Sequence, residues 1–365
     1  MSRIFVRGVG ERVTEEVLMG VVRRILLDST DDLAWLQPGQ TVLLKPAVNS
    51  PHPYPSTTHP LAVKAVADEI LARGGKVVVG DQGGIGHVMH TPHGVTRGST
   101  REMFQQTGIA GVLGSDVQLA AFEEGDWERD FYLFKDDDTE HWPDGFYLTD
   151  WVRKADHIIN LPRLSTHSMA GVTLGFKNLV GLLREDSRLE FHTQGPFFDW
   201  MKRWAKSEDF KLDFPDKKDF FERMTEISLA VKDKLRLTLF VGTQAQVTFG
   251  PDKYTYRLFG ERLASHVAKP DVGLIFASQD PVAAEALAIA YLAELYRALA
   301  PWHKKLLQKF LMRMNGMAKE LGTYDVWDNP FIVHALKIGL GERKAELLGL
   351  DEFKDLSGQL KTRLK

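Results

Sequence analysis

Short apolar runs bounded by glycine, proline and charged residues recur along this chain. The runs TVLLKPAV at 41–48 and KVVVGD at 76–81 have the length and composition of buried strands. Between them, residues 59–73 carry apolar side chains at helical spacing and end at Gly74 and Gly75, which are typical of a helix stop. A strand, a helix and a second strand in this order predict a β-α-β unit whose two strands are parallel.

Three further apolar runs extend this pattern. They are HIINLP at 157–162, LRLTLFVG at 235–242 and DVGLIFAS at 271–278, and the last of them precedes a long apolar helix at 280–298. Strands that alternate with helices predict an α/β fold. We expect a largely parallel sheet, in one or more parts, with helices on both faces.

Two polar and aromatic stretches interrupt the alternation. Residues 120–150 read as a hairpin or loop, and residues 196–224, rich in Phe, Trp and Lys, read as a helical lid. We therefore expect two lobes with a site between them. The N-terminal α/β lobe would span 1–185, a lid or linker 186–230, and a C-terminal α/β lobe with long helices 231–365.

Composition limits the chemistry that the chain can carry. The 365 residues are 44% hydrophobic and 26% charged, as in ordinary globular proteins, and the net charge of −3 does not favour nucleic acid. Cysteine is absent, which excludes disulfides, thiolate nucleophiles and iron–sulfur clusters held by this chain. The sequence has neither a signal-peptide pattern nor a transmembrane run. We expect a cytoplasmic protein, a small-molecule substrate and, by default, a homodimer.

Polar residues follow the carboxyl ends of three predicted strands, which is where open α/β sheets bind their ligands. If these strands are parallel neighbours, their ends share one crevice. Lys45, in the first of these strands, is a candidate for catalysis. The candidates for binding a substrate or cofactor are Asn49, Asp81, Gln82, Gly83, Arg163 and Ser165 at the strand ends, and Asn178 further along the chain.

The stretch THSMAGVTLGFKNLVGLLREDSRLEFH gathers two imidazoles and one amine around a glycine-rich turn. Imidazole is the commonest metal ligand, and a lysine amine can hold an anion or form a covalent link. His167 and Lys177 are therefore candidates for catalysis, and His167 and His192 for binding a metal. The alternative is that these are separate surface residues, or core histidines bonded to the backbone.

Two glycine- and histidine-rich features lie after the second strand. The loop GDQGGIG at 80–86 has the composition of an anion-binding turn, with an ordinary flexible turn as the alternative. His87, His90 and His93 have a spacing that can bind a metal, although histidines in loops are more often only solvated.

Two features towards the C-terminus favour structural roles. Asp280 followed by Pro281 is a typical start of a helix, so we expect it to cap the helix rather than to catalyse; Glu285 lies in the same stretch. Residues 302–320 form an amphipathic basic helix. A packed helix with a solvated basic face is favoured, and a helix that touches a membrane or a partner is the alternative.

The segments VLLKPAVNSP, GGKVVVGDQGG, ADHIINLPRLSTHSMAGVTLGFKNLVG and IFASQDPVAAEALA occur in this order. With THPLAV between the first two, they resemble the bacterial and archaeal family catalogued as domain of unknown function 362. The resemblance covers residues 40–340, and its most specific part runs from Asp156 to Gly181. The family name implies no reaction. Many relatives carry a ferredoxin-like cysteine module that this chain lacks, and Val241-Gly242 stands where the family usually has Asp-Gly.

A more distant resemblance is to the nickel-pincer lactate racemases. In those enzymes a lysine holds a thiocarboxylated pyridinium nucleotide, and histidines ligate nickel or move the substrate proton. The resemblance places Lys177 at that lysine, His167 before it, and His192 near the nickel-binding histidine. Asp81 and Gln82 stand where the racemases have a catalytic histidine. The resemblance therefore implies a lysine–histidine pocket rather than lactate racemisation itself.

Together these features predict an enzyme that acts on a small anionic substrate, either a carboxylate or an oxygenated compound. The reaction would shuttle a proton or hydride, as in isomerisation, racemisation, elimination or reduction, with or without a divalent metal or metal-organic cofactor. Lys45, Arg163 and Lys177 would hold the anion and His167 would act as general acid or base. The alternatives are a carrier that binds a cofactor or metal without turnover, and a scaffold that docks through the predicted lid and the basic helix.

Overall fold

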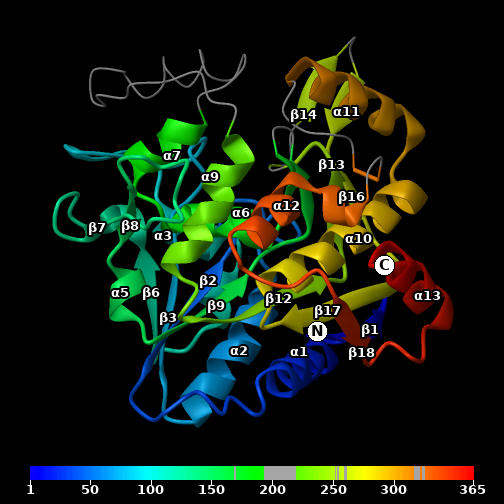
Figure 1. Ribbon diagram of the computed structural model, residues 1–365, viewed down its shortest axis with the longest axis horizontal. Coiled ribbons are helices and arrows are strands. Elements are labelled where there is room, and N and C mark those ends of the chain that lie inside the picture. Colours follow the sequence, from blue (N-terminus) through cyan, green and yellow to red (C-terminus); the bar gives the residue numbers. More distant parts are fainter. Residues whose placement is uncertain are drawn as a thin grey trace.

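An eight-stranded sheet forms the centre of the molecule. The computed structural model describes residues 1–167, 170–192, 219–250, 252, 255–258, 261–315, 321–322 and 325–365. The strand order is β18-β1-β17-β12-β9-β2-β3-β6 (Figure 1). These strands are β1 (Ser2–Gly10), β2 (Thr41–Pro46), β3 (Lys76–Asp81), β6 (Val117–Ala121), β9 (His157–Leu161), β12 (Leu235–Gly242), β17 (Val272–Ser278) and β18 (Ala345–Leu348).

The sheet is largely parallel, as the sequence predicts. Strands β12, β9, β2, β3 and β6 are parallel to one another. Strand β17 is antiparallel to both of its neighbours, β12 and β1, and β1 is parallel to β18, so β17 alone runs against the direction that the other strands of this sheet share. All five strands predicted from apolar runs are present.

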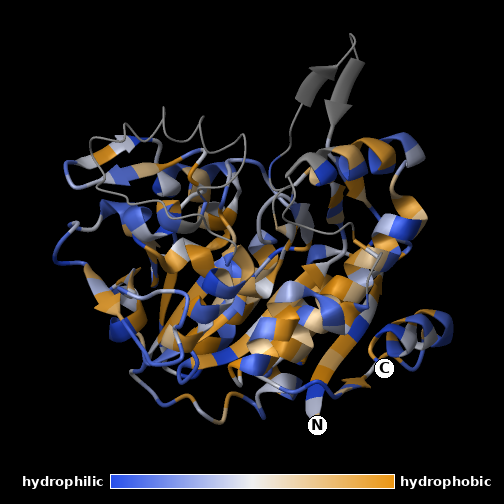
Figure 2. Ribbon diagram, turned by 45° about the horizontal axis from the view of Figure 1, so that its top comes forward, coloured by the Kyte–Doolittle hydropathy of each residue, from blue (hydrophilic) through white to orange (hydrophobic). Residues whose placement is uncertain are grey.

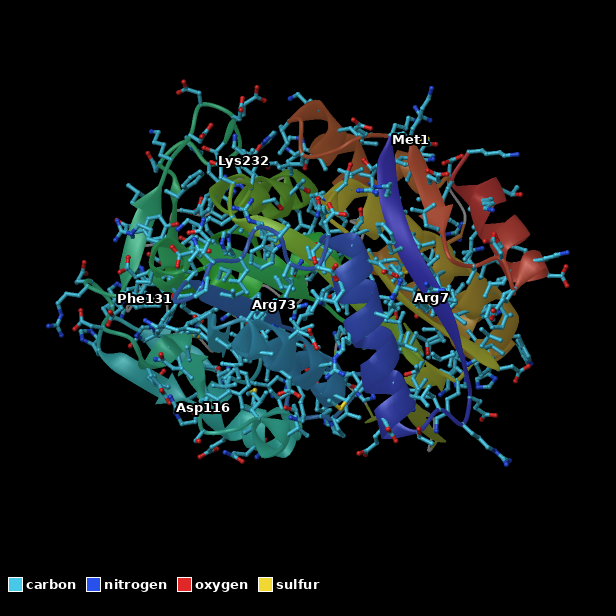
Figure 3. The ribbon with its side chains drawn as sticks, turned by 90° about the horizontal axis from the view of Figure 1, so that it is seen from below. Met1, Arg7, Arg73, Asp116, Phe131 and Lys232 are labelled. Carbon is cyan, nitrogen blue, oxygen red and sulfur yellow. The ribbon has the colours of Figure 1, made fainter. Side chains whose placement is uncertain are left out.

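Alternating side chains send the sheet's apolar residues into two separate cores. Leu43 and Phe276 belong to one core, whereas their chain neighbours Val42 and Ile275 belong to the other. Helices α1 (Glu15–Ser29) and α2 (Pro60–Ala72) cover the second core, and Figure 3 shows them across one face of the sheet. Helices α9 (Phe220–Glu226), α10 (Pro281–Leu299) and α12 (Pro330–Lys337) cover the first. The result is three layers, with helices on both faces.

Smaller elements surround this sandwich. A four-stranded sheet has the order β11-β10-β13-β16, and two-stranded ribbons pair β4 with β5, β7 with β8 and β14 with β15. These strands are β4 (Met89–Thr91), β5 (Gly94–Arg97), β7 (Phe131–Phe134), β8 (Phe146–Thr149), β10 (Ser165–His167), β11 (Gly171–Thr173), β13 (Ala245–Thr248), β14 (Thr255–Leu258), β15 (Glu261–Ala264) and β16 (His266–Ala268). The remaining helices are α3 (Thr100–Gln106), α4 (Ile109–Val112), α5 (Trp151–Lys154), α6 (Gly175–Asn178), α7 (Glu185–Phe191), α11 (Trp302–Asn315) and α13 (Lys354–Arg363).

The structure describes the first of the two predicted insertions completely and the second only in part. The β7–β8 hairpin confirms the interpretation of residues 120–150. Of the predicted lid, residues 196–218 lie outside the described part of the chain, and α9 follows them. The main sheet takes strands from both predicted lobes, and the division into lobes stays a prediction.

The start of α10 confirms the predicted helix cap. One Asp280 carboxylate oxygen accepts hydrogen bonds from the backbone N–H groups of Val282 and Ala283, at 2.8 and 3.0 Å. Pro281 occupies the first helical turn, where its missing N–H costs nothing. Although α10 is strongly apolar (Figure 2), no helix in the described ranges combines the length and apolar character needed to cross a membrane.

Candidate functional site

The carboxyl ends of β9, β2 and β3 lie side by side at one edge of the sheet. These strands are neighbours and parallel, and Lys45 of β2 pairs in register with Asn160 of β9. Asp81 ends β3 on the other side of β2. The structure therefore brings together the strand ends that the sequence analysis expected to share a crevice.

Lys45 and Asp81 form a buried ion pair at this edge. The Lys45 Nζ atom lies 2.7 Å from Asp81 Oδ1 and donates a hydrogen bond to the Pro46 carbonyl at 2.8 Å. Asp81 also accepts backbone hydrogen bonds from Val48 and Gln82, at 2.6 and 2.8 Å. Burial lowers the pKa of Lys45, and the Asp81 charge opposes this shift. Through these bonds the ion pair connects the ends of β2 and β3 with the backbone at Val48, after β2.

Gly181 is the residue against which this ion pair packs. A Cβ atom at this position would lie 2.0 Å from Asp81 Oδ1 and 2.9 Å from Lys45 Nζ. Real Cβ contacts are not this short, so glycine here is required by close approach rather than by backbone conformation. The glycine that ends the motif GFKNLVG is thereby explained.

A chain of buried polar contacts fixes the short helix α6, which carries Lys177. Glu285 Oε2 accepts the N–H groups of Gly175 and Phe176, at 2.7 and 3.3 Å, at the start of this helix. At its end, Asn178 Nδ2 donates to Asn160 Oδ1 at 2.7 Å and to the Lys45 carbonyl at 2.9 Å. Asn178, predicted as a binding residue, thus holds α6 against the strand ends.

Glu285 is a buried carboxyl group whose pKa is raised to about 8 by burial, with the two backbone N–H groups opposing the shift. For an acid whose pKa is higher in the folded than in the unfolded state, stability is lost as the pH rises from the unfolded value of 4.5 to about 8. Replacement by glutamine preserves the shape and removes the charge. We expect Glu285→Gln to be more stable than the wild type above pH 8, by about 2–4 kcal/mol.

Urea unfolding at several pH values checks this expectation. The advantage of Glu285→Gln should shrink as the pH falls and disappear near pH 4.5. The exposed Glu16→Gln on α1 is a control that should change little at any pH. A pH-independent loss of stability in Glu285→Gln would show instead that the charged carboxylate is the native form.

Lys177 interacts electrostatically with the basic side chains His167, His192, Arg163 and Arg188. We call Lys177, His167, His192 and Arg163 the Lys177 cluster. His167 and His192 are buried and Lys177 is half-buried. Burial first, and then the charges of Arg188 and Arg163, lower the pKa of Lys177 to about 7. Burial and then the charge of Lys177 hold the pKa values of both histidines well below 6.5.

The cluster therefore combines neutral bases with positive charge. No hydrogen bond or ion pair joins the Lys177 amine to another residue in the described ranges. The charges that shift its pKa come from arginines, not from carboxylates. A small anion would neutralise this excess positive charge, and near pH 7 about half of the Lys177 amines carry a lone pair that can accept a proton.

The two histidines present different nitrogens. His192 Nδ1 lies 2.7 Å from the Arg188 carbonyl, which can only accept, so Nδ1 carries the proton and Nε2 is the basic nitrogen. His167 Nδ1 instead accepts the Ala170 N–H at 3.1 Å, so neutral His167 carries its proton on Nε2. Of the two predicted metal ligands, His192 has the tautomer that a metal requires, and His167 has that of a hydrogen-bond donor.

Helix α7 positions His192 through a second buried network. Arg188 donates to the Gly83 carbonyl at 2.7 Å and to Glu185 Oε2 at 3.3 Å. Gln82 Nε2 donates to the same Glu185 oxygen at 2.6 Å. Burial raises the pKa of Glu185 to about 7, with Arg188 opposing the shift. Gln82 and Gly83, predicted as binding residues, thus connect the loop after β3 to the helix that directly precedes His192.

The first three amides of the glycine-rich loop after β3 are engaged within the protein. The N–H groups of Gln82, Gly83 and Gly84 donate to Asp81 Oδ1, to Thr100 Oγ1 and to the Asn49 carbonyl respectively. These bonds engage three of the donors that an anion-binding turn at 80–86 would use, and so give this part of the loop a structural role. Anion binding by the loop as a whole stays a prediction.

The three histidines that follow this loop do not gather around a common point. His87 Nε2 lies 2.7 Å from Asp252 Oδ2. His90 packs against the rings of Trp127 and Phe131, and burial lowers its pKa to about 4. His93 is exposed. These three described histidines do not form a group close enough to hold one metal ion, so the metal site considered for them is not formed.

Two more predicted binding residues make contacts apart from the Lys177 cluster. Asn49 Nδ2 donates to Asp252 Oδ1 at 3.0 Å, and the buried Ser165 hydroxyl donates to the Thr166 carbonyl at 2.8 Å. Arg163 is buried and donates to the Ser56 carbonyl. Its charge lowers the pKa of both His167 and Lys177.

Sequence reasoning missed several residues that build this site. Asn160, Glu185 and Arg188 hold the elements that carry Lys177 and His192. Glu285, which the sequence analysis named only beside the predicted helix cap, holds the start of α6. A signal existed for two of them, because Asn160 interrupts an apolar strand and Glu285 an alanine-rich apolar helix. A polar residue at such a position needs a buried partner.

The family model described as "Domain of unknown function (DUF362)" matches residues 42–290. The chain belongs to this family. The match includes β2, β3, β9 and β12, the Lys177 cluster and the first half of α10. The resemblance stated from the sequence motifs is therefore confirmed.

Two individual proteins are similar to parts of this family member. The "Thylakoid-associated protein sll1697" of Synechocystis sp. (strain ATCC 27184 / PCC 6803 / Kazusa) is 29% identical over 164 residues, which are 44% of this chain and 44% of that protein. The chain thus matches less than half the length of this relative. The lactate racemase apoprotein from Thermoanaerobacterium thermosaccharolyticum aligns with 66% of this chain and 50% of its own, at a TM-score of 0.37 and 14% identity.

Proposed function

We propose that this protein is an enzyme that binds a small carboxylate or similar anion at the Lys177 cluster and transfers a proton at a carbon next to oxygen. The observation that carries the proposal is the Lys177 amine, whose pKa is about 7 and whose charged neighbours are arginines. A base whose pKa lies near the working pH transfers protons most efficiently. The reaction classes that begin with this step include isomerisation, racemisation and elimination.

Each member of the cluster has a role in this proposal. Arg163 supplies a permanent positive charge for the anion. His167 donates its Nε2 proton to a substrate oxygen, and so stabilises negative charge that develops there. The neutral Lys177 amine removes the proton from the adjacent carbon and can return it.

A metal or metal-organic cofactor fits part of the donor set. His192 offers Nε2 as a ligand, oriented by the Nδ1 bond to the Arg188 carbonyl, and Lys177 offers an uncharged amine for a covalent link. Such a group, when bound, would supply a hydride acceptor and extend the reaction class to hydride transfer. His167 fits such a ligand set poorly, because its Nδ1 already accepts a backbone N–H.

Solvent-deuterium incorporation tests the proposal on many compounds of one chemical class. The purified protein is incubated in D2O with a panel of 2-hydroxy- and 2-oxocarboxylates, and exchange at carbon is followed by NMR. We expect exchange in at least one compound, with a loss of about 10²-fold or more in Lys177→Met and in His167→Gln. The exposed His93→Asn serves as control. Native mass spectrometry of the same preparations detects a bound cofactor.

The carrier hypothesis makes a different prediction in these experiments. A carrier retains a cofactor or metal in the native mass spectrum but exchanges no substrate proton. Protein with neither exchange nor a retained group would contradict both hypotheses for the Lys177 cluster.

A second candidate function, association with a membrane surface, is favoured by α11. Trp302, Leu306 and Phe310 occur at intervals of four residues on this helix and are 76%, 63% and 60% exposed. The sequence of α11 contains five basic residues, counting His303, and no acidic one. In Figure 2 the ribbon of this helix carries both hydrophobic and hydrophilic colours. An apolar stripe with basic residues is typical of helices that lie in the interface of anionic membranes. The name of the Synechocystis relative, a thylakoid-associated protein, is consistent with this proposal.

Vesicle co-sedimentation checks the role of α11. We expect binding to vesicles that contain phosphatidylglycerol and little binding to pure phosphatidylcholine, with loss of binding at high salt. The double variant Leu306→Gln/Phe310→Gln should weaken binding by at least about 10-fold, because it removes two apolar side chains from the stripe. The matched control is Val17→Gln, an exposed apolar residue of α1. Equal sedimentation of all three proteins would contradict the proposal.

A further inference from the structure

A second group of potential metal ligands lies where three separate segments meet. His141 comes from the loop between β7 and β8, Glu226 ends α9, and His334 lies in α12. One nitrogen of each histidine and one carboxylate oxygen of Glu226 all lie within 4.8 Å of one another. In the described part of the chain, this is the one group of three or more such side chains that close together.

Both imidazoles point a nitrogen at the same carboxylate. His141 Nδ1 lies 2.5 Å and His334 Nε2 3.0 Å from Glu226 Oε1. The two rings meet edge to face, with centroids 5.1 Å apart. Glu226 and His334 are buried, whereas the side chain of His141 is 25% exposed and leaves a way in from solvent. The three donor atoms thus already converge on one point.

This ligand set suits a divalent transition-metal ion. Two imidazole nitrogens and one carboxylate oxygen are a common set for Zn²⁺ and its neighbours in the first row. Zinc bonds of about 2.0–2.1 Å place tetrahedral ligand atoms about 3.3 Å apart. The observed separations therefore need to change by only about 1–1.5 Å for all three atoms to reach one ion.

The nearby cations are engaged with other carboxylates. Arg223, one turn before Glu226, has its Nη1 atom 2.6 Å from Glu190 Oε1 and also pairs with Asp219. Lys337, one turn after His334, lies 3.0 Å from Glu140. Neither cation is paired with Glu226. Besides the two imidazoles, Glu226 accepts only the backbone N–H of His141, at 3.3 Å, among the hydrogen bonds of the described residues. A buried carboxylate with no cationic side chain paired to it is well placed to bind a positive ion.

We propose that His141, Glu226 and His334 bind a divalent transition-metal ion, with Zn²⁺ as the representative, which joins the β7–β8 loop, α9 and α12. The ion would fix the end of α9. The first residue of this helix, Phe220, packs edge to face on the His192 ring with centroids 6.1 Å apart. Metal occupancy would therefore hold one wall of the Lys177 cluster in place, although none of the three ligands belongs to that cluster.

Titration of the chelator-treated full-length protein with Co²⁺ and Zn²⁺ tests the proposal. Native mass spectrometry gives the stoichiometry, and the ligand-field absorbance of Co²⁺ reports its coordination. We expect His141→Asn and Glu226→Gln to weaken this binding by at least about 100-fold, since each removes a direct ligand. Zn²⁺ should also raise the melting temperature of the wild type and not that of His141→Asn. Because His141 is partly exposed, His141→Asn should fold, and circular dichroism verifies this.

Two control variants separate this site from the Lys177 cluster. His192→Asn should keep the metal ion at the proposed site, and the exposed His93→Asn should behave like the wild type. Binding that survives both His141→Asn and Glu226→Gln, or no binding in the folded wild type, overturns the proposal. Binding lost only in His192→Asn also overturns it and assigns the ion to the Lys177 cluster.

Discussion

Replacement of Lys177 by methionine is expected to make the protein more stable at pH 7, by about 2–4 kcal/mol. The pKa of this amine falls from 10.5 to about 7 in the folded protein, chiefly because of burial. A depressed pKa means that the folded state holds the ammonium form at a cost. Methionine has a similar length and carries no charge, so it removes this cost.

The pH dependence of this effect has a definite sign. Below pH 7 the folded and unfolded states are both protonated at Lys177, and the wild type bears the full cost. Between pH 7 and 10.5 the unfolded state binds more protons, so the wild type gains stability as the pH rises. The advantage of Lys177→Met should therefore be largest below pH 7 and vanish near pH 10.5.

Urea unfolding of both proteins between pH 6 and 10 measures this difference. Lys64→Met serves as control, because Lys64 makes a surface pair with Asp68 that contributes little stability. A destabilised Lys177→Met protein would mean that the amine is a structural cation. A stabilised variant that has lost proton exchange would show that Lys177 is retained for function at the expense of stability.

The second large effect is expected from a single added methyl group. Gly181→Ala places a Cβ atom 2.0 Å from Asp81 Oδ1, so the Lys45–Asp81 ion pair must separate or the backbone must move. Breaking a buried ion pair typically costs about 3–5 kcal/mol, because it leaves buried charges uncompensated. We expect a loss of this order in the free energy of unfolding.

The matched control is Gly20→Ala, in the exposed face of α1. A Cβ atom there meets no other atom within 4 Å, and alanine favours a helix over glycine by about 1 kcal/mol. Gly20→Ala should therefore stabilise the protein, whereas the same chemical change at Gly181 destabilises it. Similar effects at the two positions would show that the ion pair tolerates the intrusion.

The local sequence pattern predicts most strands of the central sheet and the helices α2 and α10. The strand from Leu235 to Gly242 has the predicted bounds, and β2, β3, β9 and β17 lie within their predicted runs. Short apolar runs between turn residues specify buried strands because only a strand buried on both faces needs apolar side chains at successive positions. The apolar run of β17 does not predict its antiparallel direction. The direction of a strand depends on how the chain returns to the sheet, and not on the apolar residues of the strand.

The sequence by itself determined that an amine and two imidazoles lie around a glycine-rich turn after a strand. It also determined that no thiol chemistry is available. The tertiary structure alone decided which of these groups are neutral, and which nitrogen each histidine presents. It also brought together His141, Glu226 and His334, which lie far apart in the sequence and form no recognisable ligand motif there. The physical reason is that pKa values, tautomers and ligand sets depend on burial and on contacts between distant segments, whereas strands and helices follow from short-range pattern.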